Sequence, residues 1–283
     1  LVAAVFFMMQ LTCGNFSLDL SSPAVMGILN LTPDSFSDGG RFPDCDSAIS
    51  HALAMVSEGA AIIDIGGEST RPGAASVTVQ QELDRVMPVV ESLVTELPVP
   101  VSVDTSKLEV VQAAIGAGAG MINDVMALRA QGAIEVVRDA GHVALCLMHM
   151  QGEPRTMQQN PRYGDVVADV RNFLVDRAAV CERAGIARSR ILLDPGFGFG
   201  KTLEHNTALL KNIDLLAGEG YPLLVGISRK SMIGQLLGDV PVDQRLQGSV
   251  AAAVIAAMKG ANILRVHDVR ETVDALKIVE AML

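Results

Sequence analysis

The chain has 283 residues, of which 49% are hydrophobic and 19% are charged, and its formal net charge at pH 7 is −10. A negative net charge without any run of lysine and arginine argues against nucleic acid or an anionic membrane as the main partner. The four cysteines are scattered without a C-x-x-C pair, which argues against a disulfide or zinc framework and favours a cytoplasmic protein with small buried thiols.

The first nine residues are all apolar and contain no basic residue. This run is far too short to cross a bilayer. A weak signal peptide is one interpretation, and an upstream extension before a start at Met8 or Met9 is the simpler one. We therefore assign residues 1–20 to an N-terminal extension and lead-in segment, and residues 21–283 to a single domain.

Short apolar runs rich in β-branched residues alternate with helical patterns along the rest of the chain. Continuous apolar runs are typical of parallel strands that helices cover. The expected strands are 25–29, 61–65, 99–103, 121–122, 143–148, 191–193, 223–225 and 262–266. The expected helices include 46–58, 79–96, 108–116, 130–140, 165–184 and 245–259.

Eight strands that alternate with helices over a chain of this length predict a (β/α)8 barrel, an α/β fold of the TIM-barrel type. The alternative is a doubly wound open sheet, which usually has a glycine-rich turn after its first strand. Here the first expected strand leads instead into NLTPDSFSDGG, residues 30–40. The barrel is the better interpretation.

Polar residues mark the carboxyl end of every expected strand. They are Asn30, Asp64, Asp104, Asn123, His149, Asp194, Ser228 with Arg229 and Lys230, and Arg265 with His267. Barrel enzymes build their active sites from this end of the strands, where groups from different strands converge. The sequence therefore predicts an enzyme whose site lies at the mouth of the barrel.

These polar residues fall into two chemical kinds. Asp104, Asn123 and Asp194 can pair with the N–H groups of a planar heterocycle. The cations suit a phosphate or carboxylate group, and they are Arg71, Arg229, Lys230, Arg265 and His267. Backbone amides that open a helix after residues 228–231 would add to the anion site. We expect a polar heterocycle that is attached to, or reacts with, an anion.

One segment near these residues resembles part of a nucleotide-binding motif but does not match it. Residues 196–202, GFGFGKT, end like a phosphate-binding Walker loop, but Pro195 stands where the first glycine of that motif belongs. We expect no nucleotide-binding loop there.

Two long segments closely resemble the signatures of dihydropteroate synthases, the folate-pathway enzymes that sulfonamides inhibit. They are residues 26–40, MGILNLTPDSFSDGG, and residues 64–73, DIGGESTRPG. Shorter matching motifs are SVDT at 102–105, IND at 122–124, LMHM at 147–150, LDPGFGFGK at 193–201, SRKS at 228–231 and RVHD at 265–268. The resemblance spans residue 25 to about residue 280.

The resemblance implies that the chain joins p-aminobenzoate to 6-hydroxymethyl-7,8-dihydropterin pyrophosphate, giving 7,8-dihydropteroate and pyrophosphate. The implied pterin contacts are Asp104, Asn123, Met148, Asp194, Gly198, Phe199, Lys230 and Arg265. The implied p-aminobenzoate contacts are Phe36, Thr70, Arg71, Pro72 and Ser231. The implied pyrophosphate contacts are Asn30, Thr70, Arg71, Arg265 and His267, with Asn30 as a ligand of Mg²⁺.

The resemblance also implies a mechanism, in which Asp104, Lys230, Arg265, His267 and Arg71 are the catalytic groups. An arylamine is neutral at pH 7, so it attacks without a general base, and the difficult step is expulsion of pyrophosphate. We expect an SN1-like substitution, with Arg265, His267 and Mg²⁺ stabilising the leaving group. We also expect loops 30–40 and 70–76 to close over the site, so that the pterin substrate binds first.

The family is usually a homodimer, and the small residues of 251–257 would suit such an interface as well as core packing. Two alternatives remain at this point. One is a pterin-binding methyltransferase barrel, which would need a corrinoid partner and would not use a pyrophosphate site. The other is a non-catalytic paralogue, in which decay of the charged strand-end residues would be expected.

Overall fold

The computed structural model describes residues 9–32, 45–69, 76–153 and 156–282. Eight parallel strands form one sheet in the order β8-β7-β6-β5-β4-β3-β10-β9. They are β3 (Ala24–Asn30), β4 (Ile62–Gly66), β5 (Val101–Asp104), β6 (Met121–Asp124), β7 (Ala144–Met148), β8 (Ile191–Asp194), β9 (Leu224–Val225) and β10 (Ile263–Val266). A parallel bridge between Leu193 and Leu223 joins the two edges, so the sheet is a nearly closed barrel.

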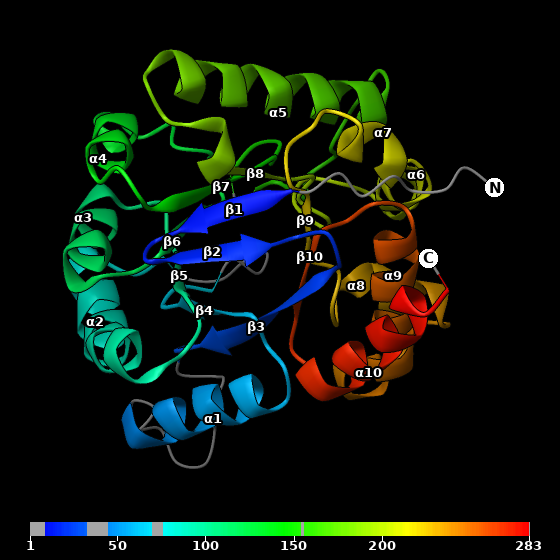
Figure 1. Ribbon diagram of the computed structural model, residues 1–283. Coiled ribbons are helices and arrows are strands. Elements are labelled where there is room, and N and C mark those ends of the chain that lie inside the picture. Colours follow the sequence, from blue (N-terminus) through cyan, green and yellow to red (C-terminus); the bar gives the residue numbers. More distant parts are fainter. Residues whose placement is uncertain (1–8, 33–44, 70–75, 154–155, 283) are drawn as a thin grey trace.

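Helices follow the strands and surround the barrel as an outer ring (Figure 1). They are α1 (Cys45–Ser57), α2 (Val79–Glu96), α3 (Leu108–Ala117), α4 (Ala133–Asp139), α5 (Val166–Arg183), α6 (Leu203–Lys211), α7 (Ile213–Ala217), α8 (Ser231–Leu236), α9 (Leu246–Met258) and α10 (Val269–Glu280). The expected (β/α)8 barrel is confirmed.

The expected strands lie within two residues of the observed ones, and the differences have local causes. The strand expected at 99–103 begins at Val101, because Pro100 has no amide hydrogen to donate to a neighbouring strand. The strand expected at 121–122 continues to Asp124, because the polar residues at its end still pair with β5 and β7.

An antiparallel hairpin, which the sequence analysis did not predict, closes one end of the barrel. It consists of β1 (Gln10–Cys13) and β2 (Phe16–Asp19), and it lies across the barrel in Figure 1. Its buried side chains join a cluster of residues from the strand starts, listed here: Leu11, Cys13, Leu20, Met26, Ile62, Met121, Ala144, Cys146, Leu192, Leu224 and Ile263. The lead-in segment therefore contributes a floor to the barrel, while the domain division at residue 21 stays a prediction.

The turn of the hairpin approaches the barrel very closely. Gly14 has a φ of +64°, and a Cβ atom at this position would lie 2.8 Å from the Cα of Gly120. Any other residue would be strained and would clash with backbone. Gly14 therefore allows the hairpin to pack against the strand starts.

Inside the barrel, alternate residues of each strand change from apolar at the floor to polar at the mouth. Ile62 and Ile263 belong to the floor cluster, whereas Asp64 and Arg265, two residues further along the same strands, bond to each other. The intervening residues, such as Ile63 and Leu264, pack in the larger core with the helices. The period of two in each strand therefore places a polar layer on top of an apolar one.

In the part of the chain that the structure describes, no helix combines the length and the apolar character needed to span a bilayer.

The cysteines Cys13, Cys146 and Cys181 are buried, and burial raises the pKa of the Cys13 thiol to about 12. Such thiols are poor nucleophiles at neutral pH.

Candidate active site at the barrel mouth

The polar layer is organised around Asp64, whose side chain is fully buried on β4. One carboxylate oxygen accepts from the Ser102 hydroxyl at 2.6 Å. The other accepts from the Asn123 amide at 3.2 Å and from the Arg265 guanidinium at 2.5 Å. Three neighbouring groups from three different strands are thereby held by one carboxylate.

Arg265 lies between two carboxylates. Its Nε atom bonds to Asp64, and its Nη2 atom donates to Asp104 at 2.9 Å. Burial opposes the charge on Arg265, but the two carboxylates outweigh it and raise the pKa of the guanidinium. Two carboxylates share one cation, and burial raises the pKa of Asp104 to about 7 despite the neighbouring Arg265.

Asp194 and Lys230 are two further charged groups of the mouth, and each acts electrostatically on the other. Asp194 is 6% exposed, and its carboxylate accepts from the backbone amide of Gly196 at 2.7 Å. Burial raises the pKa of Asp194, an effect that Lys230 opposes. Burial also lowers the pKa of Lys230 to about 8, although Asp194 favours its charged form. Both groups are therefore poised to respond to a bound ligand.

An apolar wall adjoins this pair. Phe199 packs against a small buried cluster that contains Val125, Met148 and Met150. The Lys230 ammonium lies 4.4 Å from the centroid of the Phe199 ring and donates to the Phe197 carbonyl. A flat ring bound here would meet apolar contacts beside the N–H acceptors Asp104, Asn123 and Asp194.

The anion part of the mouth is built from β3, β10 and the loop after β9. The Ser228 hydroxyl lies 3.1 Å from Nδ1 of His267 and accepts from the His267 backbone amide. The side-chain oxygen of Asn30 lies near the carboxyl end of β4, 3.8 Å from where a Cβ of Gly66 would stand. Asn30 and His267 therefore border the Arg265 cluster from neighbouring strands.

Arg229 does not belong to the anion site, contrary to the sequence analysis. Its guanidinium forms two bonds to the Asp268 carboxylate, at 3.0 and 2.5 Å. The reason is its backbone, which has a φ of +58°. Its own amide bonds to Ser249, and its carbonyl accepts from Arg245. Arg229 therefore fixes the loop that presents Lys230.

The helix that follows Lys230 adds little to an anion site. The helix α8 has six residues, so only one full turn of aligned peptide dipoles follows Ser231. Ser231 is exposed at its first position.

The structure brings together the predicted residues that it describes. These are Asn30, Asp104, Asn123, Met148, Asp194, Gly198, Phe199, Lys230, Arg265 and His267, at strand ends or in the loops that follow, and Ser231, which begins α8. Phe36, Thr70, Arg71 and Pro72 lie outside the described residues. Most of the predicted p-aminobenzoate contacts and two of the pyrophosphate contacts are among these four.

Two residues of this region were not predicted as site residues. Asp64 was noted as a strand end, but only its three bonds show it to be the centre of the polar layer. Lys201 was set aside with the Walker-like fragment, yet it is buried at 3% exposure beside the site. Its position between the glycine-rich turn of residues 196–200 and the start of α6 could have suggested a structural lysine.

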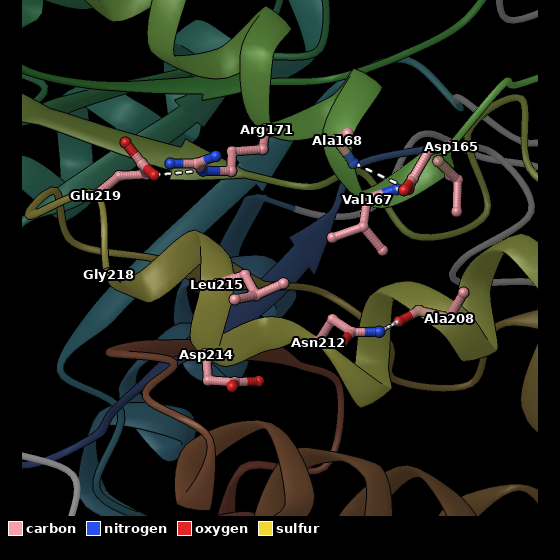
Figure 2. A pocket seen from close by; sticks show the side chains of 11 residues that line it. Asp165, Val167, Ala168, Arg171, Ala208, Asn212, Asp214, Leu215, Gly218 and Glu219 are labelled. Carbon is pink, nitrogen blue, oxygen red and sulfur yellow. Dashed lines mark hydrogen bonds and ion pairs between the residues drawn. The ribbon is translucent and has the colours of Figure 1, made fainter.

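A separate groove of about 620 Å³ lies on the outside of the barrel, between α5, α6 and α7. Figure 2 shows its lining residues, with Arg171 paired to Glu219 and the Asp165 carboxylate capping the start of α5. None of the strand-end residues lines this groove. We therefore place the chemistry at the mouth.

Comparison with known proteins agrees with this arrangement. The sequence profile of a family described as pterin binding enzymes matches residues 26–267. The chain belongs to the dihydropteroate synthase family of pterin-binding enzymes. The dihydropteroate synthase of Escherichia coli is 56% identical, and the match covers 97% of each chain.

Solved dihydropteroate synthases share the fold. The Yersinia pestis enzyme, solved with a sulfonamide drug complex, is 56% identical with a TM-score of 0.92, covering 97% of this chain and 99% of that one. The Xanthomonas albilineans enzyme in complex with 7,8-dihydropteroate is 49% identical with a TM-score of 0.87, covering 96% and 98%. The match to the dihydropteroate synthase family therefore extends over every described residue of the mouth.

Proposed function

We propose that this chain joins p-aminobenzoate to 6-hydroxymethyl-7,8-dihydropterin pyrophosphate, releasing pyrophosphate and forming 7,8-dihydropteroate for folate biosynthesis. The observation that supports this most strongly is the convergence of Asp104, Asn123, Asp194 and Lys230 beside the cationic Arg265. That convergence occurs in a chain that matches a dihydropteroate complex over 96% of its length.

In this proposal, polar side chains bind the N–H edge of the pterin ring and apolar side chains contact its face. The Asp194 carboxylate would accept from N–H groups at the edge of the ring in charge-assisted geometry, and the Asn123 amide could both accept and donate there. Met148 and Phe199 would contact its face, with Lys230 over Phe199. Gly198 leaves the approach to Lys230 open, since a Cβ there would lie 3.3 Å from the Lys230 side chain.

We propose an SN1-like substitution. The C–O bond between the methylene and pyrophosphate breaks, and its electron pair leaves with pyrophosphate while the dihydropterin delocalises the positive charge. Asp104 would balance that charge, and Arg265 with His267 would stabilise the departing anion. The amine lone pair of p-aminobenzoate then forms the C–N bond, and the resulting ammonium loses a proton to water.

Mg²⁺ is part of this proposal, and the groups at the mouth suit it. Mg²⁺ prefers oxygen ligands and usually keeps several waters beside substrate phosphates. The Asn30 side-chain oxygen has this chemistry, and it makes no hydrogen bond within the part of the chain that the structure describes. When bound, Mg²⁺ would neutralise charge on the pyrophosphate group. Asn30 would hold it together with the phosphate oxygens.

The p-aminobenzoate site is proposed from the resemblance, with Phe36, Thr70, Arg71, Pro72 and Ser231 as its contacts. Thr70 and Arg71 would also contact pyrophosphate. A sulfonamide resembles p-aminobenzoate, and we propose that sulfonamides inhibit this chain as competitors, as the complex of the Yersinia pestis relative suggests.

We also propose a cytoplasmic homodimer. The small residues Ala252 and Ala256 of α9 are buried within the chain itself, so they serve its own core. The exposed apolar residues Ile255 and Met258 of α9, at 44% and 56% exposure, and Ile278 of α10, at 68%, support an interface there. The two helices lie side by side in Figure 1.

The buried free thiols support the proposed cytoplasmic location, because free thiols persist in a reducing compartment.

The assay that tests the activity measures pyrophosphate release. Release is expected only when both p-aminobenzoate and the pterin pyrophosphate are present, and a sulfonamide is expected to raise the KM for p-aminobenzoate without changing kcat. Absence of pyrophosphate release with both substrates and Mg²⁺ would contradict the proposal.

The pH profile of kcat/KM for the pterin pyrophosphate is expected to be bell-shaped, because this ratio reports groups of the free enzyme. Burial raises the pKa of Asp104 to about 7, so its carboxylate becomes neutral as the pH falls through that value. Burial lowers the pKa of Lys230 to about 8, so its ammonium is lost as the pH rises past that value. The maximum should lie between the two. Steady-state rates across this range give the profile, and an acid limb that persists in Asp104→Asn would assign it to another group.

A further inference from the structure

The loop after β8 carries Phe199 and contacts Lys230, and its backbone is held almost wholly by side chains. Gly196, Gly198 and Gly200 all have positive φ, at +68°, +79° and +62°. These alternating left-handed residues direct successive carbonyls toward different sides of the loop. A Cβ at Gly196 would lie 1.9 Å from the carbonyl oxygen of His149, so this conformation depends on glycine.

Each carbonyl of residues 196–200 accepts from a donor elsewhere in the chain or in the loop. Gly198 accepts from the Gln158 amide at 2.5 Å, and Gly200 accepts from the Tyr163 hydroxyl at 2.8 Å. Phe197 accepts from Lys230. The remaining two carbonyls, those of Gly196 and Phe199, accept from Lys201 at 2.9 and 3.1 Å.

Lys201 also binds the preceding loop of the barrel. Its Nζ atom lies 2.9 Å from Nδ1 of His149 and 3.3 Å from the His149 carbonyl oxygen. Burial and the neighbouring Lys201 ammonium lower the pKa of His149 to about 3, so its ring is neutral and can accept. Four acceptors from two loops therefore surround the buried Nζ atom of Lys201. Burial lowers the pKa of Lys201 to about 7, and the neighbouring Asp194 carboxylate favours its charged form.

We infer that Lys201 is a positioning residue of the pterin slot: its ammonium sets the conformation of residues 196–200 and thereby places the Phe199 ring and the Phe197 carbonyl that Lys230 contacts. This inference rests on the proposed function. Lys201 itself lies behind the loop, 3% exposed, so its effect is exerted through Phe199 and Lys230.

The direct test compares Lys201→Met with Lys211→Met. Methionine keeps an unbranched side chain and removes the ammonium, and Lys211, exposed in the last turn of α6, is the matched control. Calorimetric titration should show that Lys201→Met raises the Kd of the pterin pyrophosphate about tenfold or more, since bonds to a charged group are lost from three carbonyls and a ring nitrogen. Its KM for p-aminobenzoate should change less than about threefold, and Lys211→Met should match the wild type in both.

The other outcomes decide against the inference. A lower melting temperature with an unchanged Kd would show a purely structural lysine, and equal losses for both substrates would show a general distortion. If Lys201→Met does not fold, the double variant Gln158→Leu and Tyr163→Phe removes two other donors to the same loop. Selective loss of pterin affinity in that variant supports the inference, and an unchanged Kd overturns it. A wild type without pyrophosphate release would instead overturn the proposed function, independently of these variants.

Discussion

Arg265→Met is expected to lower the free energy of unfolding by about 3–5 kcal/mol, because removing one member of a buried ion pair leaves uncompensated charge. Here two carboxylates depend on the same guanidinium. Asp64 is fully buried, and Asp104 is 16% exposed. Urea unfolding followed by circular dichroism measures the change, and turnover should fall together with stability because Arg265 also faces the leaving group in the proposed mechanism.

A double variant separates the two effects of Arg265. Asp64→Asn in the Arg265→Met background removes one of the unpaired charges, so it should recover part of the lost stability without restoring turnover. An Arg265→Met variant within about 1 kcal/mol of the wild type would show that the Asp64–Arg265–Asp104 cluster is not the electrostatic centre of the fold.

Asp194→Ala is expected to weaken pterin binding by a large factor. The carboxylate is 6% exposed and lies beside Lys230, so the proposed bond to the pterin edge forms away from water. Truncating such a partner costs about 2–5 kcal/mol, which corresponds to about 30- to 5,000-fold in Kd. Calorimetric titration with the pterin pyrophosphate measures this loss.

Two controls accompany Asp194→Ala. Asp194→Asn keeps an acceptor for the Gly196 amide while removing the charge, so an intermediate Kd is expected. Asp139→Ala removes a carboxylate that is 68% exposed on the outer ring and should leave the Kd unchanged. Retention of wild-type affinity by Asp194→Ala would exclude this carboxylate from the pterin slot.

The barrel could be predicted because a long-range pattern repeats eight times. Each strand is short, but the alternation of apolar runs and helices is consistent over the chain. An error in the bounds of one strand therefore does not change the predicted fold. The hairpin of β1 and β2 could not be found in this way. Its strands have four residues each and lie outside the repeat, and their packing depends on the close approach of Gly14 to Gly120.

Site residues were predictable where position in a strand determines direction. Asp104 and Asn123 end neighbouring parallel strands, so their side chains must reach the same mouth. The prediction that Arg229 belongs to the anion site was wrong, because this residue lies in a loop rather than a strand. Its left-handed backbone turns the side chain toward Asp268. The role of Lys201 depends on carbonyl directions in a loop, which residue types alone do not specify.

The hairpin at the barrel floor has a consequence for the order of folding. Its side chains pack against Leu224 and Ile263, and the Asn262 side chain donates to the Leu20 carbonyl across 242 residues of sequence. Such separations make loop closure slow. During synthesis, residues 10–20 therefore leave the ribosome early and stay without their final neighbours until β10 has emerged. A nascent chain halted before Asn262 would expose this apolar hairpin to chaperones, and completion of β10 is what buries it.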